Sequence, residues 1–99
     1  MPELILRPAF RAWLDGLRDT RARNAVARRL DRLAFGHEGD ASDVGEGVRE
    51  LRIHLGPGFR VYYVPRGEAV IVVLRGGDKD TQRRDIPAAI ADADALEDR

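Results

Sequence analysis

The feature that most constrains the fold is a change in hydrophobic period near residue 47. Before it, apolar residues recur three and four positions apart, which is the spacing of one helix face; after it, they alternate with polar residues, as in a strand with one buried side. The sequence therefore predicts helices first and a sheet second. With 99 residues, 43% of them apolar, the chain is expected to form one domain over residues 1–99.

The N-terminal part predicts a short strand followed by a helix. Residues 4–6 are apolar, and Arg7-Pro8 ends the run. Beyond the proline the apolar residues keep to one helical face, so we interpret the only tryptophan, Trp13, as a core side chain and not as a platform for stacking bases. The residues on this face are Phe10, Trp13, Leu14 and Leu17.

A second helix is expected from Thr20, read as its N-cap, to a stop at Gly36. Its buried stripe is formed by Val26, Leu30 and Leu33. The opposite side is rich in arginine, which is typical of a solvated face but would also suit contact with an RNA backbone. These arginines are Arg21, Arg23, Arg28, Arg29 and Arg32.

Residues 37–47 are polar and glycine-rich, so a loop is expected there. Three strands are predicted after it, over residues 48–55, 59–64 and 69–74. The first two form a hairpin through the turn Gly56-Pro57-Gly58. The third is an unbroken apolar run, which indicates an interior strand covered on both faces.

The C-terminal residues predict a final helix. We expect it to begin near Asp85 as N-cap, because Pro87 suits only the first turn of a helix, and the segment around Lys79 is then a loop. The element order is β-α-α-β-β-β-α. This order predicts an α+β domain in which a helical hairpin packs on a small, mostly antiparallel sheet.

The composition excludes several kinds of chemistry. The chain has no cysteine, which excludes disulfides and thiolate chemistry, and its only imidazoles are His37 and His54, so neither a metal site nor a cofactor is expected. No stretch approaches the ~20 consecutive apolar residues that cross a bilayer, and no secretory signal pattern is present. We therefore expect a cytoplasmic protein without a membrane partner.

The charged residues are unevenly distributed, although the formal net charge is zero. Residues 49–84 carry eight basic and four acidic groups, an excess that permits local binding of phosphate. All basic residues but one are arginine. The single lysine, Lys79, directly follows the apolar strand region, and an ammonium, unlike a guanidinium, can give up a proton. Lys79 is therefore a candidate functional residue.

Three ordered motifs resemble the RelE/ParE superfamily of bacterial toxins. They are Glu50-Leu51-Arg52-Ile53, the segment Gly-Phe-Arg-Val-Tyr-Tyr at 58–63 and the segment Gly-Gly-Asp-Lys-Asp-Thr-Gln at 76–82. The chain is most similar to the HigB-like, phage-related branch of addiction-module killer proteins, and the resemblance covers essentially the whole chain. It implies the toxin of a type II toxin–antitoxin system, encoded beside an antitoxin that is often a helix-turn-helix protein.

The resemblance also implies functions for individual residues. Arg60 matches the arginine that contacts the scissile phosphate, and Lys79 matches a basic residue suited to neutralising the departing oxygen. Arg60 has the alternative role of cross-strand partner for Glu50. His54 is the most natural general base, although a lone histidine on a strand is more often an exposed polar residue. The catalytic candidates are Arg52, His54, Arg60 and Lys79, the RNA-binding candidates are Arg49, Tyr62, Gln82 and Arg83, and Tyr63 is assigned to the core.

One departure weakens this comparison, since RelE-like enzymes often carry a Tyr or His near the start of the C-terminal segment and here Asp85 stands near that place. Acid–base chemistry must then come from His54, Lys79, Glu50 or Tyr62. Two aspartates, Asp78 and Asp80, flank Lys79, and we expect them to hold it in ion pairs that favour charge stabilisation over proton donation.

Three functional hypotheses remain open. RelE-like toxins cleave mRNA on the ribosome without a metal, so the first is a metal-independent mRNA endoribonuclease whose ribosome dependence is undecided. The second is a non-enzymatic toxin that, like the ParE branch, inhibits DNA gyrase or another protein. The third is an inactive remnant that only binds its antitoxin. Both toxin hypotheses predict an acidic or amphipathic antitoxin element that packs on the sheet or on the helical hairpin.

Overall fold

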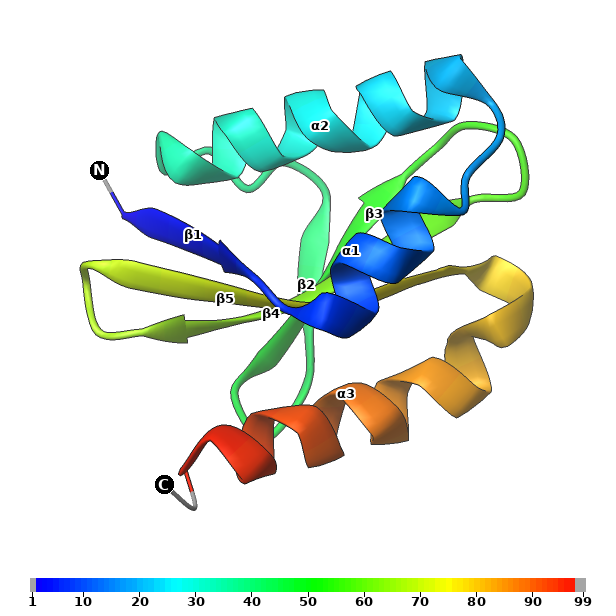
Figure 1. Ribbon diagram of the computed structural model, residues 1–99. Helices are drawn as coiled ribbons and strands as arrows, with labels where there is room; N and C mark the ends of the chain where they lie inside the picture. The colour runs from blue at the N-terminus through cyan, green and yellow to red at the C-terminus, as the bar shows by residue number, and fades with distance from the viewer. Residues whose placement is uncertain (1, 98–99) are drawn as a thin grey trace.

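The computed structural model describes residues 2–97 and places a five-stranded sheet between two layers of helices (Figure 1). The strands lie in the order β1-β5-β4-β3-β2; only the β1–β5 pair is parallel, which makes the sheet mixed. Their bounds are β1 Glu3–Leu6, β2 Ala41–Gly45, β3 Val48–Ile53, β4 Phe59–Arg66 and β5 Val70–Asp78.

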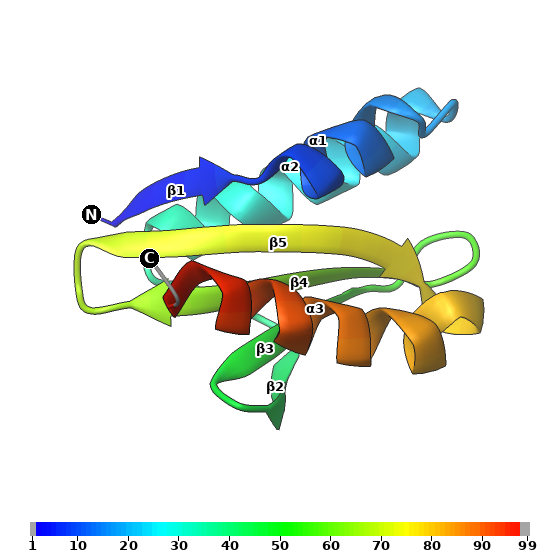
Figure 2. The same cartoon turned by 60° about the horizontal axis from the view of Figure 1, so that its bottom comes forward.

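The helices cover opposite faces of this sheet, as Figure 2 shows from the side. Helices α1 (Pro8–Asp15) and α2 (Thr20–Ala34) pack on one face, and α3 (Gln82–Glu97) packs on the other. A short 3-10 helix, η1 (Lys79–Thr81), joins β5 to α3. The predicted α+β class and helical hairpin are confirmed. None of the helices within residues 2–97 is long and apolar enough to cross a membrane.

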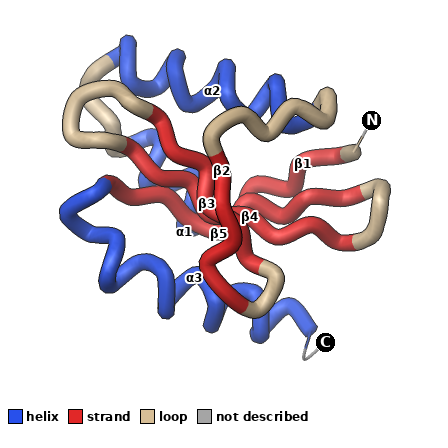
Figure 3. Tube along the Cα trace, turned by 180° about the vertical axis from the view of Figure 1, so that it is seen from behind, coloured by secondary structure: helices blue, strands red, loops and turns tan. Residues whose placement is uncertain are grey.

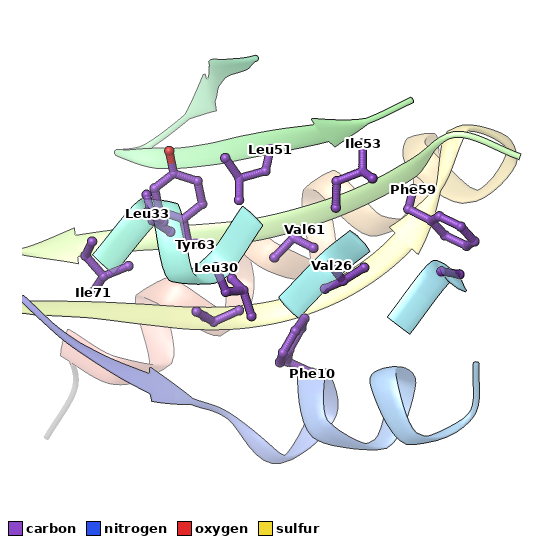
Figure 4. Packing of buried hydrophobic residues seen from close by; sticks show 12 residues of the cluster. Phe10, Val26, Leu30, Leu33, Leu51, Ile53, Phe59, Val61, Tyr63 and Ile71 are labelled. Carbon is purple, nitrogen blue, oxygen red and sulfur yellow. The ribbon is translucent and has the colours of Figure 1, made fainter. Parts of the chain in front are cut away.

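The larger core lies between the sheet and the helical hairpin (Figure 4). Leu51 and Val61 project into it from β3 and β4, and Tyr63 is fully buried beside them, as the alternation predicts. Trp13 is half-buried against this core, with its ring 5.8 Å from that of Phe10 and 6.0 Å from that of Phe59. The interpretation of Trp13 as a packing residue is confirmed.

Strand β5 contributes to both cores. Ile71 and Val73 point to the hairpin side, whereas Val72 and Leu74 point to the α3 side. The prediction of an interior strand covered on both faces is therefore confirmed. Because both of its faces are buried, the strand shows no polar alternation in sequence.

The predicted order is wrong in one element, because residues 41–45 of the expected loop form the edge strand β2. This strand pairs antiparallel with β3 and is interrupted by an irregularity between Asp43 and Gly45. Its side chains are half-buried or exposed, so it has no apolar stripe by which the sequence could reveal it. The observed order is β-α-α-β-β-β-β-α (Figure 3).

Two expected helix boundaries and one expected loop are also wrong. The N-cap of α2 is Asp19, whose carboxylate accepts the Arg21 amide at 2.9 Å, and not Thr20. Helix α3 begins at Gln82, so Asp85 is no cap and Pro87 lies inside the helix. The segment around Lys79 is η1 and not a loop, because the Asp78 carboxylate accepts backbone amides of this turn.

The Gly76-Gly77 pair lies where the end of β5 passes between the two helix layers. A Cβ on Gly76 would overlap the ring of Trp13, and a Cβ on Gly77 would overlap the carboxylate of the buried Asp85. Both positions therefore need glycine for lack of space. This close passage brings η1 and Lys79 to the end of the sheet at which the β3–β4 turn lies.

Candidate active site

The register of β3 and β4 brings the predicted polar residues onto one face. Arg52 pairs directly with Arg60, and Glu50 pairs with Tyr62. Paired residues of antiparallel strands point to the same side of a sheet. Alternation alone does not say whether Arg52 and Arg60 share a face, because that depends on the register of the hairpin. In the structure they do share a face, and it is the face that α3 covers.

Glu50 is the centre of a buried polar cluster on this face. It is 1% exposed and accepts a hydrogen bond from Gln82 Nε2 at 2.8 Å. Its Oε1 lies 3.6 Å from Arg52 Nη1 and 3.8 Å from Arg60 Nε. The cross-strand pairing of Arg60 with Glu50 is therefore present, and one carboxylate serves two guanidinium groups.

The Arg60 guanidinium has more donors than the acceptors around it can use. Its Nη1 donates only two long hydrogen bonds, to the Gly58 and Phe59 carbonyl oxygens at 3.4 and 3.3 Å. Its Nε is buried without a hydrogen-bond partner among the described residues. Unsatisfied buried donors are rare and call for an explanation. Glu50 and the two carbonyl oxygens therefore do not use all the donors of Arg60.

Arg60 lines an open cleft at the end of the sheet, next to the β3–β4 turn. The cleft has a volume of about 370 Å³ and is also lined by His54, Gly58 and Lys79. The Lys79 amide donates to the Gly58 carbonyl at 2.8 Å, which fixes η1 against the turn. Three of the four catalytic candidates thus line one cleft. Arg52 lies on the same face but outside the lining of the cleft.

His54 is exposed and is held by a carboxylate that the sequence did not indicate. Its Nε2 lies 2.5 Å from Asp40 Oδ2. Asp40 Oδ1 accepts from Arg52 Nη2 at 2.6 Å and from Arg52 Nε at 3.1 Å. With its Nε2 proton donated to Asp40, the imidazole keeps Nδ1 as a proton acceptor. Asp40 therefore orients the histidine.

The chain matches the model of a known protein family. The model of the phage-derived, Gp49-like protein family matches residues 12–95. The chain belongs to the Gp49-like family. It is a toxin-like family related to addiction modules.

Two individual proteins are similar to this Gp49-like chain. A Haemophilus influenzae protein, described as uncharacterized, is 42% identical over 80 residues, which make up 81% of each chain. The solution structure of the conserved hypothetical protein HP0894 from Helicobacter pylori has a TM-score of 0.53 at 22% identity and covers 81% of this chain and 97% of that one. At this identity the structural likeness shows the fold alone.

The structure of this Gp49-like protein corrects the expected surroundings of Lys79. Lys79 is exposed, and no carboxylate within residues 2–97 lies within ion-pair distance of its ammonium. The flanking Asp78 instead accepts the backbone amides of Asp80 and Thr81 at 2.8 and 3.1 Å. Backbone donors of the same turn are nearer than a flexible side chain, so the predicted ion pairs do not form.

The four RNA-binding candidates of this Gp49-like chain do not gather. Arg49 lies on the opposite face, where it pairs with Glu38 and Asp43 at 2.7 and 2.9 Å. Tyr62 is fully buried, and burial, with the nearby Glu50 carboxylate, raises the pKa of its hydroxyl. Gln82 donates to Glu50, and Arg83 is exposed on α3. Of these four side chains, only that of Arg83 is exposed.

Asp40 could not be found from the sequence, because its position depends on edge strand β2, which the period does not predict. Arg52 N donates to the Asp40 carbonyl at 2.9 Å, which extends the β2–β3 pairing by one residue. Arg29 of α2 adds hydrogen bonds to the carbonyls of Glu38, Asp40 and Arg52.

Within residues 2–97, no group of three or more His, Asp or Glu side chains is placed to hold a metal ion.

The hydrogen bonds of Asp40 should make the stability of the protein depend on pH. Hydrogen bonds from Arg52, and then from His54, hold the pKa of its carboxyl well below the usual value. A depressed pKa stabilises the fold above the unfolded pKa of about 3.9, and this contribution is lost as the pH falls below it. Asp40→Asn should be less stable than wild type at pH 7, and urea denaturation should show the difference shrinking between pH 5 and pH 2.

A matched control for this prediction is Asp31→Asn. Asp31 is exposed on α2 and makes no ion pair within the described part of the chain. Its stability difference from wild type should change little over the same pH range. Equal pH dependence of the two variants would contradict the role given to the Asp40 pairing.

Proposed function

We propose that the protein is the toxin of a type II toxin–antitoxin pair and that it cleaves mRNA in the cleft beside the β3–β4 turn. The observation that carries this proposal is the cleft itself, which is lined by an imidazole, a guanidinium and an ammonium, those of His54, Arg60 and Lys79. Membership of a toxin-like family supports it. These groups are suited to transferring a proton, holding a phosphate and stabilising a leaving oxygen.

In the proposed reaction, the RNA 2′-hydroxyl attacks the adjacent phosphorus. His54 Nδ1 takes the hydroxyl proton as the new O2′–P bond forms. The Arg60 guanidinium donates to the non-bridging phosphate oxygens, whose negative charge increases in the transition state. The P–O5′ bond breaks, and Lys79 neutralises and protonates the departing oxygen. The products are a 2′,3′-cyclic phosphate and a 5′-hydroxyl end, so atoms and charge balance without a further reactant.

The proposal includes a partner and a place of action. An uninhibited ribonuclease would harm its host, so a co-encoded antitoxin, of the helix-turn-helix kind in the related branch, would cover the basic cleft. The cleft is open and small, so it suits an extended single strand of RNA. The translating ribosome would present mRNA in this form. Comparing cleavage of free RNA with cleavage of mRNA on ribosomes separates the two modes of action.

The proposal is tested by inducing the chain alone and mapping new RNA ends. We expect growth arrest and new 5′-hydroxyl ends with the wild type, and a loss of both with Lys79→Ala, because its leaving-oxygen role would be removed. General acid catalysis is worth about 10²–10⁴-fold in rate. Arg18→Ala is the matched control, since Arg18 is an exposed cation between α1 and α2. Intact transcripts during growth arrest would refute the ribonuclease.

A second candidate is a toxin that inhibits a protein such as DNA gyrase without cleaving RNA. It is favoured by the carboxylates already near the site, since Arg52 is held by Asp40 and Arg60 by Glu50. The absence of an aromatic residue after Tyr63 points the same way. Inhibition of DNA supercoiling by the purified protein, with transcript lengths unchanged, would decide for this candidate. An inactive remnant would cause no growth arrest.

A further inference from the structure

A second cleft lies on the other side of His54. It has a volume of about 270 Å³ and is lined by Arg21, Asn24 and Arg28 of α2, with Ala25, and by residues 53–55 at the end of β3. His54 and Leu55 line both this cleft and the cleft of Arg60 and Lys79. The two clefts therefore adjoin at the imidazole. We call the second one the α2 cleft.

We propose that the α2 cleft is an RNA subsite that holds the nucleotides on the 5′ side of the scissile bond. This inference rests on the proposed ribonuclease and adds to it the course and the direction of the substrate strand. Three observations support it. His54 lines both clefts, Arg21 and Arg28 have no partner within residues 2–97, and Arg60 and Lys79 line only the other cleft.

The two arginines of the α2 cleft have no partner among the residues that the structure describes. Arg21 and Arg28 are exposed, and their side chains make no ion pair or hydrogen bond within residues 2–97. By contrast, Arg49, Arg52 and Arg75 are each held by a carboxylate at 2.6–2.7 Å. Free guanidinium groups on one side of a helix are available to an external anion.

Arg21 lies in the first turn of α2, beside the positive end of the helix dipole. The Asp19 carboxylate caps this end and accepts the Arg21 amide at 2.9 Å, but the Arg21 guanidinium makes no ion pair within residues 2–97. A phosphate in the cleft could therefore bind the Arg21 guanidinium close to the end of the helix.

The remaining lining residues fit a nucleotide rather than a simple anion. Asn24 offers an amide that can donate and accept hydrogen bonds with a base or a 2′-hydroxyl. Ala25, Ile53 and Leu55 supply an apolar side on which a base can rest. A single strand of RNA presents all three chemistries, namely phosphate, ribose hydroxyl and base.

The direction of the strand follows from the two clefts. In the proposed reaction, His54 takes a proton from the 2′-hydroxyl of the nucleotide on the 5′ side, and Lys79 faces the departing O5′ on the 3′ side. The α2 cleft contains His54 but neither Arg60 nor Lys79. The strand that leaves the cleft past His54 is therefore the 5′ part of the substrate.

The first experiment measures binding of labelled, non-cleavable 2′-O-methyl hexa-adenylate to the purified protein. Arg21→Gln/Arg28→Gln should bind about tenfold more weakly than wild type, and its slope of log K against log salt should fall by about 1.4, or ~0.7 for each lost phosphate contact. The control is Arg23→Gln/Arg32→Gln, which removes the same charge from exposed positions of α2 outside the cleft. It should bind like wild type.

The second experiment tests direction with cleavable RNA taken from a mapped cut site. Two added nucleotides on the 5′ side should raise kcat/KM for the wild type and the control but not for Arg21→Gln/Arg28→Gln. The same addition on the 3′ side should affect all three proteins equally. Equal behaviour of the two double variants in both assays would overturn the inference, as would a wild type that does not bind the hexa-adenylate.

The two proposals fail in different ways. Hexa-adenylate binding that depends on Arg21 and Arg28, with no RNA cleaved under any condition, would retain the α2 cleft as an RNA-binding surface but refute the ribonuclease and the assigned direction. Cleavage with no difference between the double variants would retain the ribonuclease and refute the subsite. A 3′ addition that depends on Arg21 and Arg28 would refute the assigned direction.

Discussion

Replacing Glu50 by alanine should lower the free energy of unfolding by about 3–5 kcal/mol, because it leaves a buried guanidinium without a counter-charge. The side chains of Glu50 and Arg60 are 2% and 9% exposed. Arg52 would keep Asp40 as a partner, but no other carboxylate pairs with Arg60 among the described residues. Gln82 would also lose its acceptor. Urea denaturation at pH 7 measures the loss.

Two further variants separate charge from packing at this position. Glu50→Gln keeps the size of the side chain and an acceptor for Gln82. If the missing charge causes most of the destabilisation, this variant should be only slightly more stable than Glu50→Ala. The double replacement Glu50→Met/Arg60→Met removes both charges. Its loss of unfolding free energy should be smaller than the sum of the losses of the two single variants, by about 1 kcal/mol or more. The reason is that neither charge is then left buried without its partner. Strict additivity would show that the pair is not coupled.

The side on which each residue of β3 and β4 lies could be predicted from the sequence. A period of two puts Leu51 and Ile53 opposite Glu50 and Arg52. The structure has them so, with the apolar pair in the hairpin core. A strand with one apolar face has few other ways to bury it. The same reasoning assigned Tyr63 to the core, where it is fully buried.

The contacts between strands could not be predicted in this way. Whether Arg52 and Arg60 share a face depends on the register of the hairpin, which the turn sets and the period does not. Edge strand β2 was missed because it is held by pairing with β3 and not by a buried stripe of its own. The Asp40–His54 contact follows from that pairing, so it was missed with it.

Replacing His54 by alanine should lower the rate of RNA cleavage by about 10²–10⁴-fold, the usual value of a general base. Stability should change by no more than about 0.5 kcal/mol, because the His54 side chain is 71% exposed and fills no space in the core. Single-turnover cleavage of an RNA taken from a mapped cut site measures the rate. His37→Ala is the matched control, since His37 is exposed and does not line the cleft.

The assignment of the base to His54 rests on elimination as well as on its place in the cleft. Of the four groups that the sequence offered for acid–base chemistry, Glu50 and Tyr62 are 1% and 0% exposed and bonded or packed against α3, so RNA cannot reach them. Lys79, the fourth group, is assigned to the leaving oxygen in the proposed reaction. If His54→Ala cut the same RNA at the wild-type rate, the assignment of the base to His54 would be wrong, and Lys79 would be the titratable group of the cleft left to take the proton.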